Sequence, residues 1–220
     1  MLARVLEPEV MDSAAEASDY DAMDHSGVNR VFASDFLSQL PGIGPILDVG
    51  TGTAQIPIEL CTQSKSAQVI AIDMAAHMLA VGRSNVARAG LVDRITLQLC
   101  DAKQLPYSAA SFAAVISNSI VHHIPEPAAV LAEMVRVLQP GGVIFVRDLL
   151  RPADLPTLQH LVKTYAGEAN DHQRQMFADS LHAALTLAEV QDMVTRLGFP
   201  AESVQQTTDR HWTWQARRPQ

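Results

Sequence analysis

Five short runs of apolar, largely β-branched residues alternate along the chain with segments of helical spacing, and this alternation restricts the fold more than any other feature. The runs cover residues 46–49, 68–72, 95–99, 112–117 and 143–147. Ahead of the last run, apolar residues recur on one helical face from Val130 to Leu138. A Pro and two glycines follow, and we expect residues 139–142 to form a turn. Strands that are apolar throughout and alternate with helices indicate a parallel sheet covered on both faces.

The two ends of the chain differ from this middle part. Residues 1–40 contain amphipathic stretches that we interpret as helices preceding the sheet, and residues 149–185 are predicted to be a helical insertion. A capping box at Thr186 and Glu189 predicts the start of a further helix. Two short strands near 203–208 and 211–217 follow. We therefore predict one α/β domain over residues 1–220, a doubly wound, mostly parallel seven-stranded sheet with a terminal antiparallel hairpin.

Composition excludes several classes of protein. The apolar share of 48% is enough for a sizeable core, which excludes a disordered chain. The formal net charge of -8 gives a field that repels nucleic acid, so no nucleic-acid partner is expected. No apolar run approaches the ~20 residues needed to cross a bilayer, and the N-terminus lacks a signal-peptide pattern. Cys61 and Cys100 match no paired motif, and we expect reduced, buried thiols in a cytoplasmic protein.

A Gly-rich turn between a strand and a helix, within residues 46–60, is the most informative local segment. Gly50 and Gly52 allow the backbone to turn tightly and to approach a ligand closely. The second strand ends at Asp73, where a carboxylate can accept both hydroxyl hydrogens of a ribose. The third strand ends at Asp101 and Ala102, where a side chain and a backbone amide can contact an adenine edge. The pattern predicts a nucleoside site.

Two residues decide between kinds of nucleoside cofactor. A dinucleotide fingerprint requires a third glycine where Gln55 stands, and Asp48 would repel a pyrophosphate. A cofactor with a cationic centre and an ammonium group would instead be attracted by the Asp48 carboxylate. S-adenosyl-L-methionine is such a cofactor.

The motifs resemble those of class I S-adenosylmethionine-dependent methyltransferases, particularly the small-molecule branch that includes ubiquinone/menaquinone-biosynthesis methyltransferases. Residues 47–54 resemble the first motif with Ala54 replacing its last glycine, a change that we expect to remove little. Residues 69–74, 101–102, 112–118 and 138–142 resemble the later motifs in order and spacing. The resemblance implies a Rossmann-like fold, with S-adenosyl-L-homocysteine as the product. It also implies a cofactor site made of Asp48, Gly50, Thr51, Gly52, Asp73, Met74, Asp101, Ala102 and Asn118.

Some of these assignments have structural alternatives. Met74 either lines the adenine or fills the core. Asn118 either lies beside the methionine part of the cofactor or only ends its strand.

A histidine pair, His122 and His123, follows the fourth strand at the edge where ligands bind. If the acceptor is a hydroxyl or a thiol, a neutral imidazole there can take its proton. Alternatively, one histidine packs against the next helix and the other is solvated. Since they are neighbours, at most one is expected to face the acceptor. No spacing among the eight histidines matches a metal site, and no metal is expected.

The predicted function is transfer of a methyl group from S-adenosyl-L-methionine to a small-molecule acceptor. We expect residues 1–40 to act as a helical lid and residues 149–185 to cover the acceptor pocket. The alternatives are a non-catalytic S-adenosylmethionine-binding module and, less favoured, a nucleotide-dependent dehydrogenase. The acceptor, its reacting atom and the oligomeric state are left open by the sequence.

Overall fold

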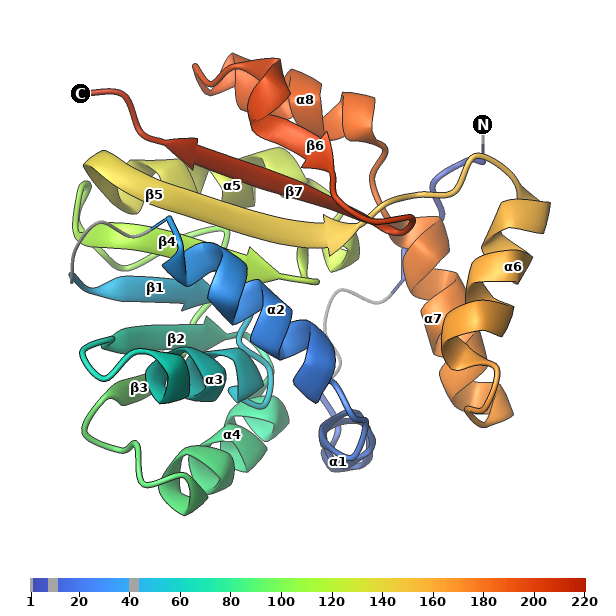
Figure 1. Ribbon diagram of the computed structural model, residues 1–220, viewed down its shortest axis with the longest axis horizontal. Coiled ribbons are helices and arrows are strands. Elements are labelled where there is room, and N and C mark those ends of the chain that lie inside the picture. Colours follow the sequence, from blue (N-terminus) through green and yellow to red (C-terminus); the bar gives the residue numbers. More distant parts are fainter. Residues whose placement is uncertain (1, 8–11, 40–43) are drawn as a thin grey trace.

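A seven-stranded sheet in the order β3-β2-β1-β4-β5-β7-β6 forms the centre of the molecule (Figure 1). The computed structural model describes residues 2–7, 12–39 and 44–220. Strands β1 to β5 are parallel, and β7 is antiparallel to both β5 and β6. The predicted fold is thus confirmed. The strands are β1 (Ile46–Val49), β2 (Val69–Asp73), β3 (Ile95–Leu99), β4 (Phe112–Asn118), β5 (Leu138–Leu149), β6 (Val204–Gln206) and β7 (His211–Arg217).

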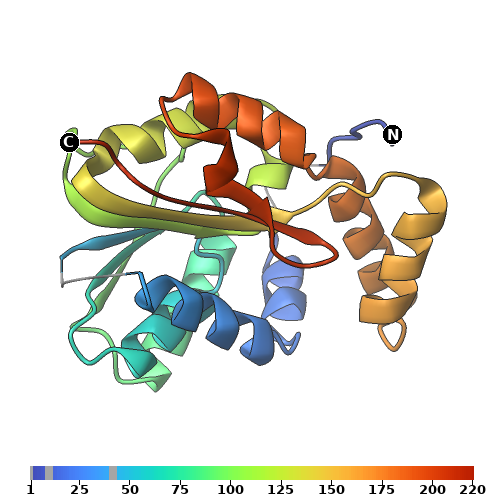
Figure 2. The ribbon, with the colours of Figure 1, turned by 45° about the horizontal axis from the view of Figure 1, so that its top comes forward.

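Helices cover both faces of the sheet. Figure 2 shows α2, α3 and α4 on one side of it, and α5 and α8 on the other. The helices are α1 (Ala14–Asp21), α2 (Ser26–Leu37), α3 (Gln55–Gln63), α4 (Ala76–Arg88), α5 (Pro127–Val137), α6 (Leu155–Ala166), α7 (Asp171–Ala183) and α8 (Leu187–Arg196), with short 3₁₀ turns η1 (Val121–His123) and η2 (Ala201–Ser203). In the described part of the chain, no helix is both long enough and apolar enough to span a bilayer.

The alternation of side chains along the central strands creates two cores. In β5, Ile144 and Val146 pack with the residues under α5 and α8, whereas Val143 and Phe145 pack with those under α2 and α3. Successive strand residues point to opposite faces, so a strand apolar at every position contributes to both cores.

The prediction of a turn at residues 139–142 is wrong. Strand β5 begins at Leu138, directly after α5, and a register shift relative to β4 occurs between Phe112 and Ala114. Gly141 takes a φ of +74°, and a Cβ at Gly142 would lie 2.9 Å from the carbonyl oxygen of Ala113. The glycines therefore permit an irregular strand pressed against its neighbour, where the sequence suggested a break.

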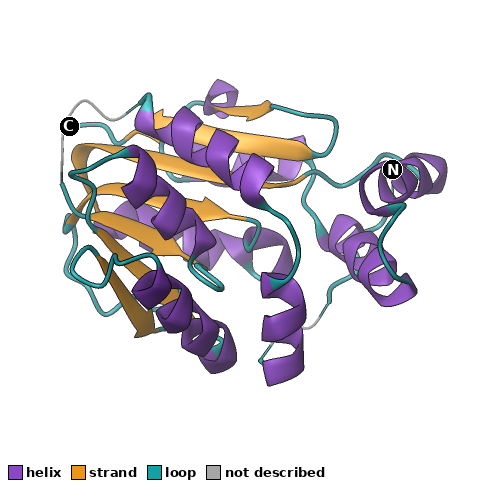
Figure 3. Cartoon of the chain, turned by 60° about the horizontal axis from the view of Figure 1, so that its bottom comes forward, coloured by secondary structure: helices purple, strands orange, loops and turns teal. Residues whose placement is uncertain are grey.

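The N-terminal segment and the insertion at residues 149–185 contain helices as predicted, but they pack at different places in the fold. Helix α2 packs Phe32 and Phe36 against Phe145, so it is one layer of the fold. Helix α1 contacts α4 beside the carboxyl ends of the strands. Helices α6 and α7 pack on each other beyond the end of β5, as Figures 1 and 3 show.

The capping box at the start of α8 gives a prediction about stability. The Thr186 hydroxyl accepts from the Glu189 backbone N–H, and the Glu189 carboxylate accepts from the Thr186 N–H in return. Thr186→Ala should lower the free energy of unfolding by about 1 kcal/mol, measured by urea denaturation. Thr195→Ala, on the exposed surface of the same helix, is the control and should change it by less than about 0.5 kcal/mol. Equal losses in the two variants would contradict the capping role.

Candidate active site

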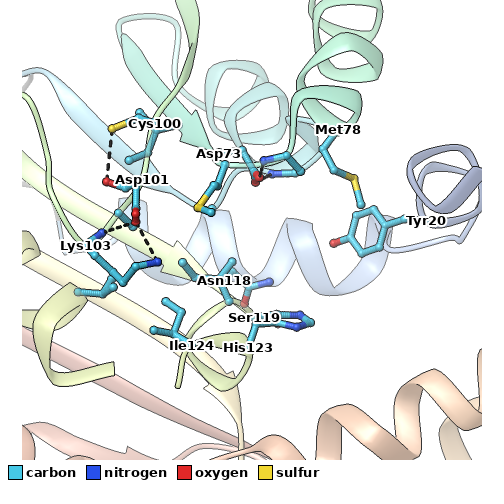
Figure 4. Close-up of a pocket in the computed structure, with 18 residues that line it drawn as sticks. Tyr20, Asp73, Met78, Cys100, Asp101, Lys103, Asn118, Ser119, His123 and Ile124 are labelled. Carbon is cyan, nitrogen blue, oxygen red and sulfur yellow. Dashed lines mark hydrogen bonds and ion pairs between the residues drawn. The ribbon is translucent and has the colours of Figure 1, made fainter. Parts of the chain in front are cut away.

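A pocket of about 860 Å³, partly open to solvent, lies at the carboxyl ends of β1, β2, β3 and β4. Figure 4 shows the side chains of Asp73, Asn118, His123 and Tyr20 around one common space. The lining residues are Tyr20, Gly50, Gly52, Ile72, Asp73, Met74, Ala75, Met78, Cys100, Asp101, Ala102, Lys103, Asn118, Ser119, Ile120, His123, Ile124 and Val130.

Seven of the nine predicted cofactor residues line this pocket, brought together from four strand ends. They are Gly50, Gly52, Asp73, Met74, Asp101, Ala102 and Asn118. Asp48 and Thr51 do not line it; both are buried, with Asp48 only 2% exposed. Of the two residues with open structural alternatives, Met74 and Asn118, the first can be decided. Met74 is 44% exposed and so does not fill the core.

The Gly-rich turn forms the floor of the pocket beside β2. Gly50 has a φ of +77°, and a Cβ there would lie 2.2 Å from Ile120 Cγ2, so no other residue fits without a shift. Gly52, at φ +55°, donates its N–H to Asp73 Oδ2 at 2.7 Å. Ala54 packs closely, as expected, but it also adopts a φ of 65°. That left-handed conformation costs roughly 1 kcal/mol in a residue with a Cβ, which the sequence did not indicate.

Asp73 connects the turn to the end of β2. In addition to the Gly52 N–H, its carboxylate accepts the Ala75 N–H, with 2.8 Å between the Ala75 nitrogen and Oδ1. A carboxylate has about four acceptor positions, so acceptor capacity remains for a hydroxyl donor in the pocket. Burial raises the pKa of Asp73 above its usual value, although these N–H donors oppose the shift. Asp73 is therefore positioned both to hold the turn and to accept from a ligand.

Asp48 lies at the end of β1, within the fold. Its Oδ2 is buried and has no hydrogen-bond partner. Burial, reinforced by the charge of Asp73 and opposed by the Thr51 hydroxyl, raises the pKa of Asp48 to about 7. A buried carboxylate next to a pocket favours a ligand that carries positive charge.

Asp101 lies on the opposite side of the pocket, after β3. It accepts the Lys103 backbone N–H at 2.9 Å and pairs with Lys103 Nζ at 3.1 Å. Burial alone would raise the pKa of Asp101, but these contacts with Lys103 lower it. Since this lysine is already paired with Asp101, the carboxylates dominate the charge of the lining.

Tyr20 is a lining residue that the sequence analysis did not select. It comes from α1, and its ring lies 5.1 Å from the ring of His25. Burial, with the charges of Asp73 and Asp48, raises the pKa of Tyr20 to about 12. Its hydroxyl therefore stays protonated at neutral pH, and it can donate a hydrogen bond into the pocket. The only signal in the sequence was an aromatic residue within a predicted N-terminal helix.

The histidine pair divides between the pocket and the interior. His123 lines the pocket, whereas His122 is 3% exposed and its Nδ1 lies 2.5 Å from Asp148 Oδ1. Asp148 Oδ1 also accepts the backbone N–H of Leu149, and Asp148 Oδ2 accepts that of Val121. Between residues 149 and 185, none of the side chains lines this pocket, so their covering role stays a prediction.

Comparison with known families matches residues 46–142 to a methyltransferase domain. These residues include β1 to β4 and the first part of β5, and thus every predicted cofactor residue.

Two curated relatives extend beyond the domain. The chain is 32% identical over 149 residues to a demethylmenaquinone methyltransferase of Porphyromonas gingivalis, covering 65% of the chain and 61% of the relative. It is 29% identical over 177 residues to a 27-O-demethylrifamycin SV methyltransferase of Amycolatopsis mediterranei, covering 79% and 61%. The chain thus spans about three fifths of the length of these relatives.

Solved structures agree with the fold. An S-adenosyl-L-methionine-dependent methyltransferase of Methanococcus maripaludis superposes with a TM-score of 0.73 at 17% identity, covering 98% of both chains. The plantazolicin methyltransferase BpumL, in complex with S-adenosylhomocysteine, gives 0.70 at 16% identity, covering 93% of this chain and 89% of that one. The [4+2]-cyclase SpnF gives 0.61 at 17% identity, covering 100% and 99%. At these identities the likeness concerns the fold alone, and the cyclase is a reminder that one fold serves several reactions.

Proposed function

We propose that the protein transfers a methyl group from S-adenosyl-L-methionine to a small-molecule acceptor. The observation that carries this proposal is the buried Asp48 carboxylate, without a hydrogen-bond partner at Oδ2, beside a pocket lined by Asp73 and Asp101. A dinucleotide, with its anionic pyrophosphate, would meet repulsion from these carboxylates. The methyltransferase domain and the names of the two relatives support the same reaction class.

The residues present fit S-adenosyl-L-methionine. Asp73 would hold the ribose, and Asp101, Ala102 and Met74 the adenine. The Gly50–Gly52 turn, Asn118 and the charge of Asp48 would hold the methionine end. When bound, the cofactor supplies an electrophilic methyl group on its sulfonium. The remaining task of the chain is to orient both reactants and to exclude water.

The acceptor side is proposed to begin at His123, since His122 is engaged with Asp148. A general base at His123 stays a prediction, because the relatives act on different atoms by name. One group of relatives consists of C-methyltransferases of ubiquinone/menaquinone biosynthesis, and another relative methylates a 27-O-demethyl compound. Cytoplasmic location and the absence of a nucleic-acid partner also stay predictions from composition.

Calorimetry with S-adenosyl-L-methionine, S-adenosyl-L-homocysteine and NAD⁺ tests the cofactor assignment. We expect one site per chain for the first two ligands and no binding of NAD⁺; the reverse pattern would support the dehydrogenase alternative. A screen of metabolite pools with methyl-labelled cofactor then tests turnover. Cofactor binding without any labelled product would favour the non-catalytic binding module.

The raised pKa of Asp48 predicts that affinity for the cofactor depends on pH. A carboxyl with a pKa of about 7 is mostly protonated at pH 6 and mostly ionised at pH 8. Binding of the sulfonium cofactor should therefore tighten, by up to about tenfold, as the pH rises from 6 to 8. Calorimetry across this range measures it. Asp48→Asn is the control and should bind more weakly with a flat profile, and an equally steep profile in that variant would exclude Asp48.

The same group has the opposite effect on the unliganded protein. Below pH 7, folded Asp48 holds a proton that the unfolded chain, with a carboxyl pKa near 3.8, has released. Its contribution to the free energy of unfolding therefore falls as the pH rises from about 4 to 7. Cofactor added at pH 8 should offset this loss.

A further inference from the structure

A cluster of three metal-ligand atoms lies at the wall of the pocket, outside the predicted cofactor site. Glu7 Oε1 lies 3.1 Å from His123 Nδ1 and 3.5 Å from His122 Nε2, and all three atoms lie within 4.8 Å of one another. Ligand atoms bound tetrahedrally to Zn²⁺ at 2.0–2.1 Å are separated by about 3.3 Å. The two shorter distances in the cluster therefore already match the edges of such a tetrahedron.

The ring of His122 is oriented by a carboxylate, as the rings of many metal-binding histidines are. Asp148 Oδ1 lies 2.5 Å from His122 Nδ1, and the same carboxylate accepts the backbone N–H groups of Val121 and Leu149. With Nδ1 on the side of Asp148, Nε2 is the ring nitrogen that faces Glu7, and it lies 3.5 Å from Glu7 Oε1. A carboxylate behind a metal-ligating histidine fixes the tautomer and the orientation of the ring in this way.

Two atoms of the cluster form an ion pair but no hydrogen bond of good geometry. Glu7 Oε1 and His123 Nδ1 are buried, and despite their separation of 3.1 Å neither makes a hydrogen bond of acceptable geometry. Buried polar atoms without a hydrogen bond are rare and costly. A cation between them would satisfy both.

Hydrogen bonds from Arg4 fix the N-terminal segment beside the cluster. Arg4 donates to the carbonyl oxygens of His122, Ile124 and Ala183 at 2.7–3.1 Å. These bonds hold residues 4–7 against η1 and the end of α7. Glu7 therefore lies beside the histidines before any metal binds.

The geometry points to a divalent transition-metal site formed by Glu7, His122 and His123, with Zn²⁺ as the best-fitting ion. Two imidazoles and one carboxylate suit Zn²⁺, and three protein ligands leave a fourth position open. Because His123 lines the pocket, the ion lies at the pocket wall. The site was not expected from the sequence, in which Glu7 is more than a hundred residues from the histidines. With the ion bound, His123 Nδ1 no longer accepts a proton, so this site and a free histidine base are competing roles.

Titration of the metal-free full-length protein with ZnCl₂ by calorimetry tests the site. We expect one Zn²⁺ per chain, at least about 100-fold weaker binding in Glu7→Gln, and 10–100-fold weaker binding in Asp148→Asn. His77→Ala is the matched control, because His77 also pairs with a carboxylate, Asp12, at 3.0 Å, but is exposed and away from the cluster. It should bind Zn²⁺ as the unchanged protein does. Equal affinity in Glu7→Gln and the unchanged protein would overturn the proposal.

A second readout covers the case in which Asp148→Asn fails to fold. Co²⁺ in place of Zn²⁺ should give the intense visible absorption of a four-coordinate ion in the unchanged protein, and Glu7→Gln should abolish it. The weak spectrum of six-coordinate Co²⁺ would overturn the site. Calorimetry with S-adenosyl-L-homocysteine on the same samples reports the cofactor site separately, so failure of the metal site is distinguishable from failure of the proposed methyl transfer.

Discussion

Replacing Gly52 by valine is expected to weaken cofactor binding by at least about 100-fold, or roughly 2.7 kcal/mol, while the protein remains folded. Gly52 has a φ of +55°, a conformation in which a β-branched residue is strongly disfavoured. A Cβ at this position would lie 3.7 Å from Tyr20 Cε1, so the added methyl groups would enter the lined space. Any shift that relieves the strain would also disturb the Gly52 N–H bond to Asp73.

A matched substitution separates backbone strain from loss of the site. Gly90 also has a left-handed φ, +69°, but a Cβ there would meet nothing within 4 Å, and it does not line the pocket. Gly90→Val should therefore lose stability through the same strain and keep its affinity for S-adenosyl-L-homocysteine. Calorimetry and thermal denaturation of both variants give the comparison. Unaltered binding by a folded Gly52→Val protein would mean that the turn does not contact the cofactor.

The fold was predictable because its determinants are local and periodic. Each central strand is a short apolar run, and such runs between helices leave few arrangements besides a parallel sheet. The error at residues 139–142 also comes from relying on local signals, because Pro and Gly usually mark turns. Here Gly141 adopts a left-handed φ and Gly142 permits close contact with β4. That contact depends on a neighbouring strand, which the local sequence does not reveal.

The candidate site was predictable only where its residues follow strand ends. Asp73, Asp101 and Asn118 belong to that group, because the topology of a parallel sheet brings the carboxyl ends together. Tyr20 and Glu7 arrive from the N-terminal segment, and their places depend on how that segment docks. Nothing in the local spacing of those residues indicates the contact.

The placement of Asp73 leads to the second large effect. Asp73→Asn should weaken binding of S-adenosyl-L-homocysteine by about 10–100-fold, the usual loss when one partner of charge-assisted hydrogen bonds is removed. Asp73 has two roles in the structure, however, because its oxygens also accept from Gly52 and Ala75. An asparagine offers one acceptor oxygen, so a loss of affinity alone would not distinguish contact with the ribose from a disturbed turn.

A double cycle with an altered ligand separates the two roles. Removal of the 2′-hydroxyl from S-adenosyl-L-homocysteine removes the ligand's proposed hydrogen-bond donor to Asp73 and leaves the Gly52 turn of the protein unchanged. If Asp73 accepts from the ribose, the deoxy ligand should lose affinity for the unchanged protein and lose much less for Asp73→Asn, since the contact is already absent. Asp209→Asn, which removes the charge of an exposed carboxylate bonded to Tyr165, should bind both ligands as the unchanged protein does. If the two losses simply add, Asp73 acts through the Gly52 turn alone, and the ribose must be held by another group in the pocket.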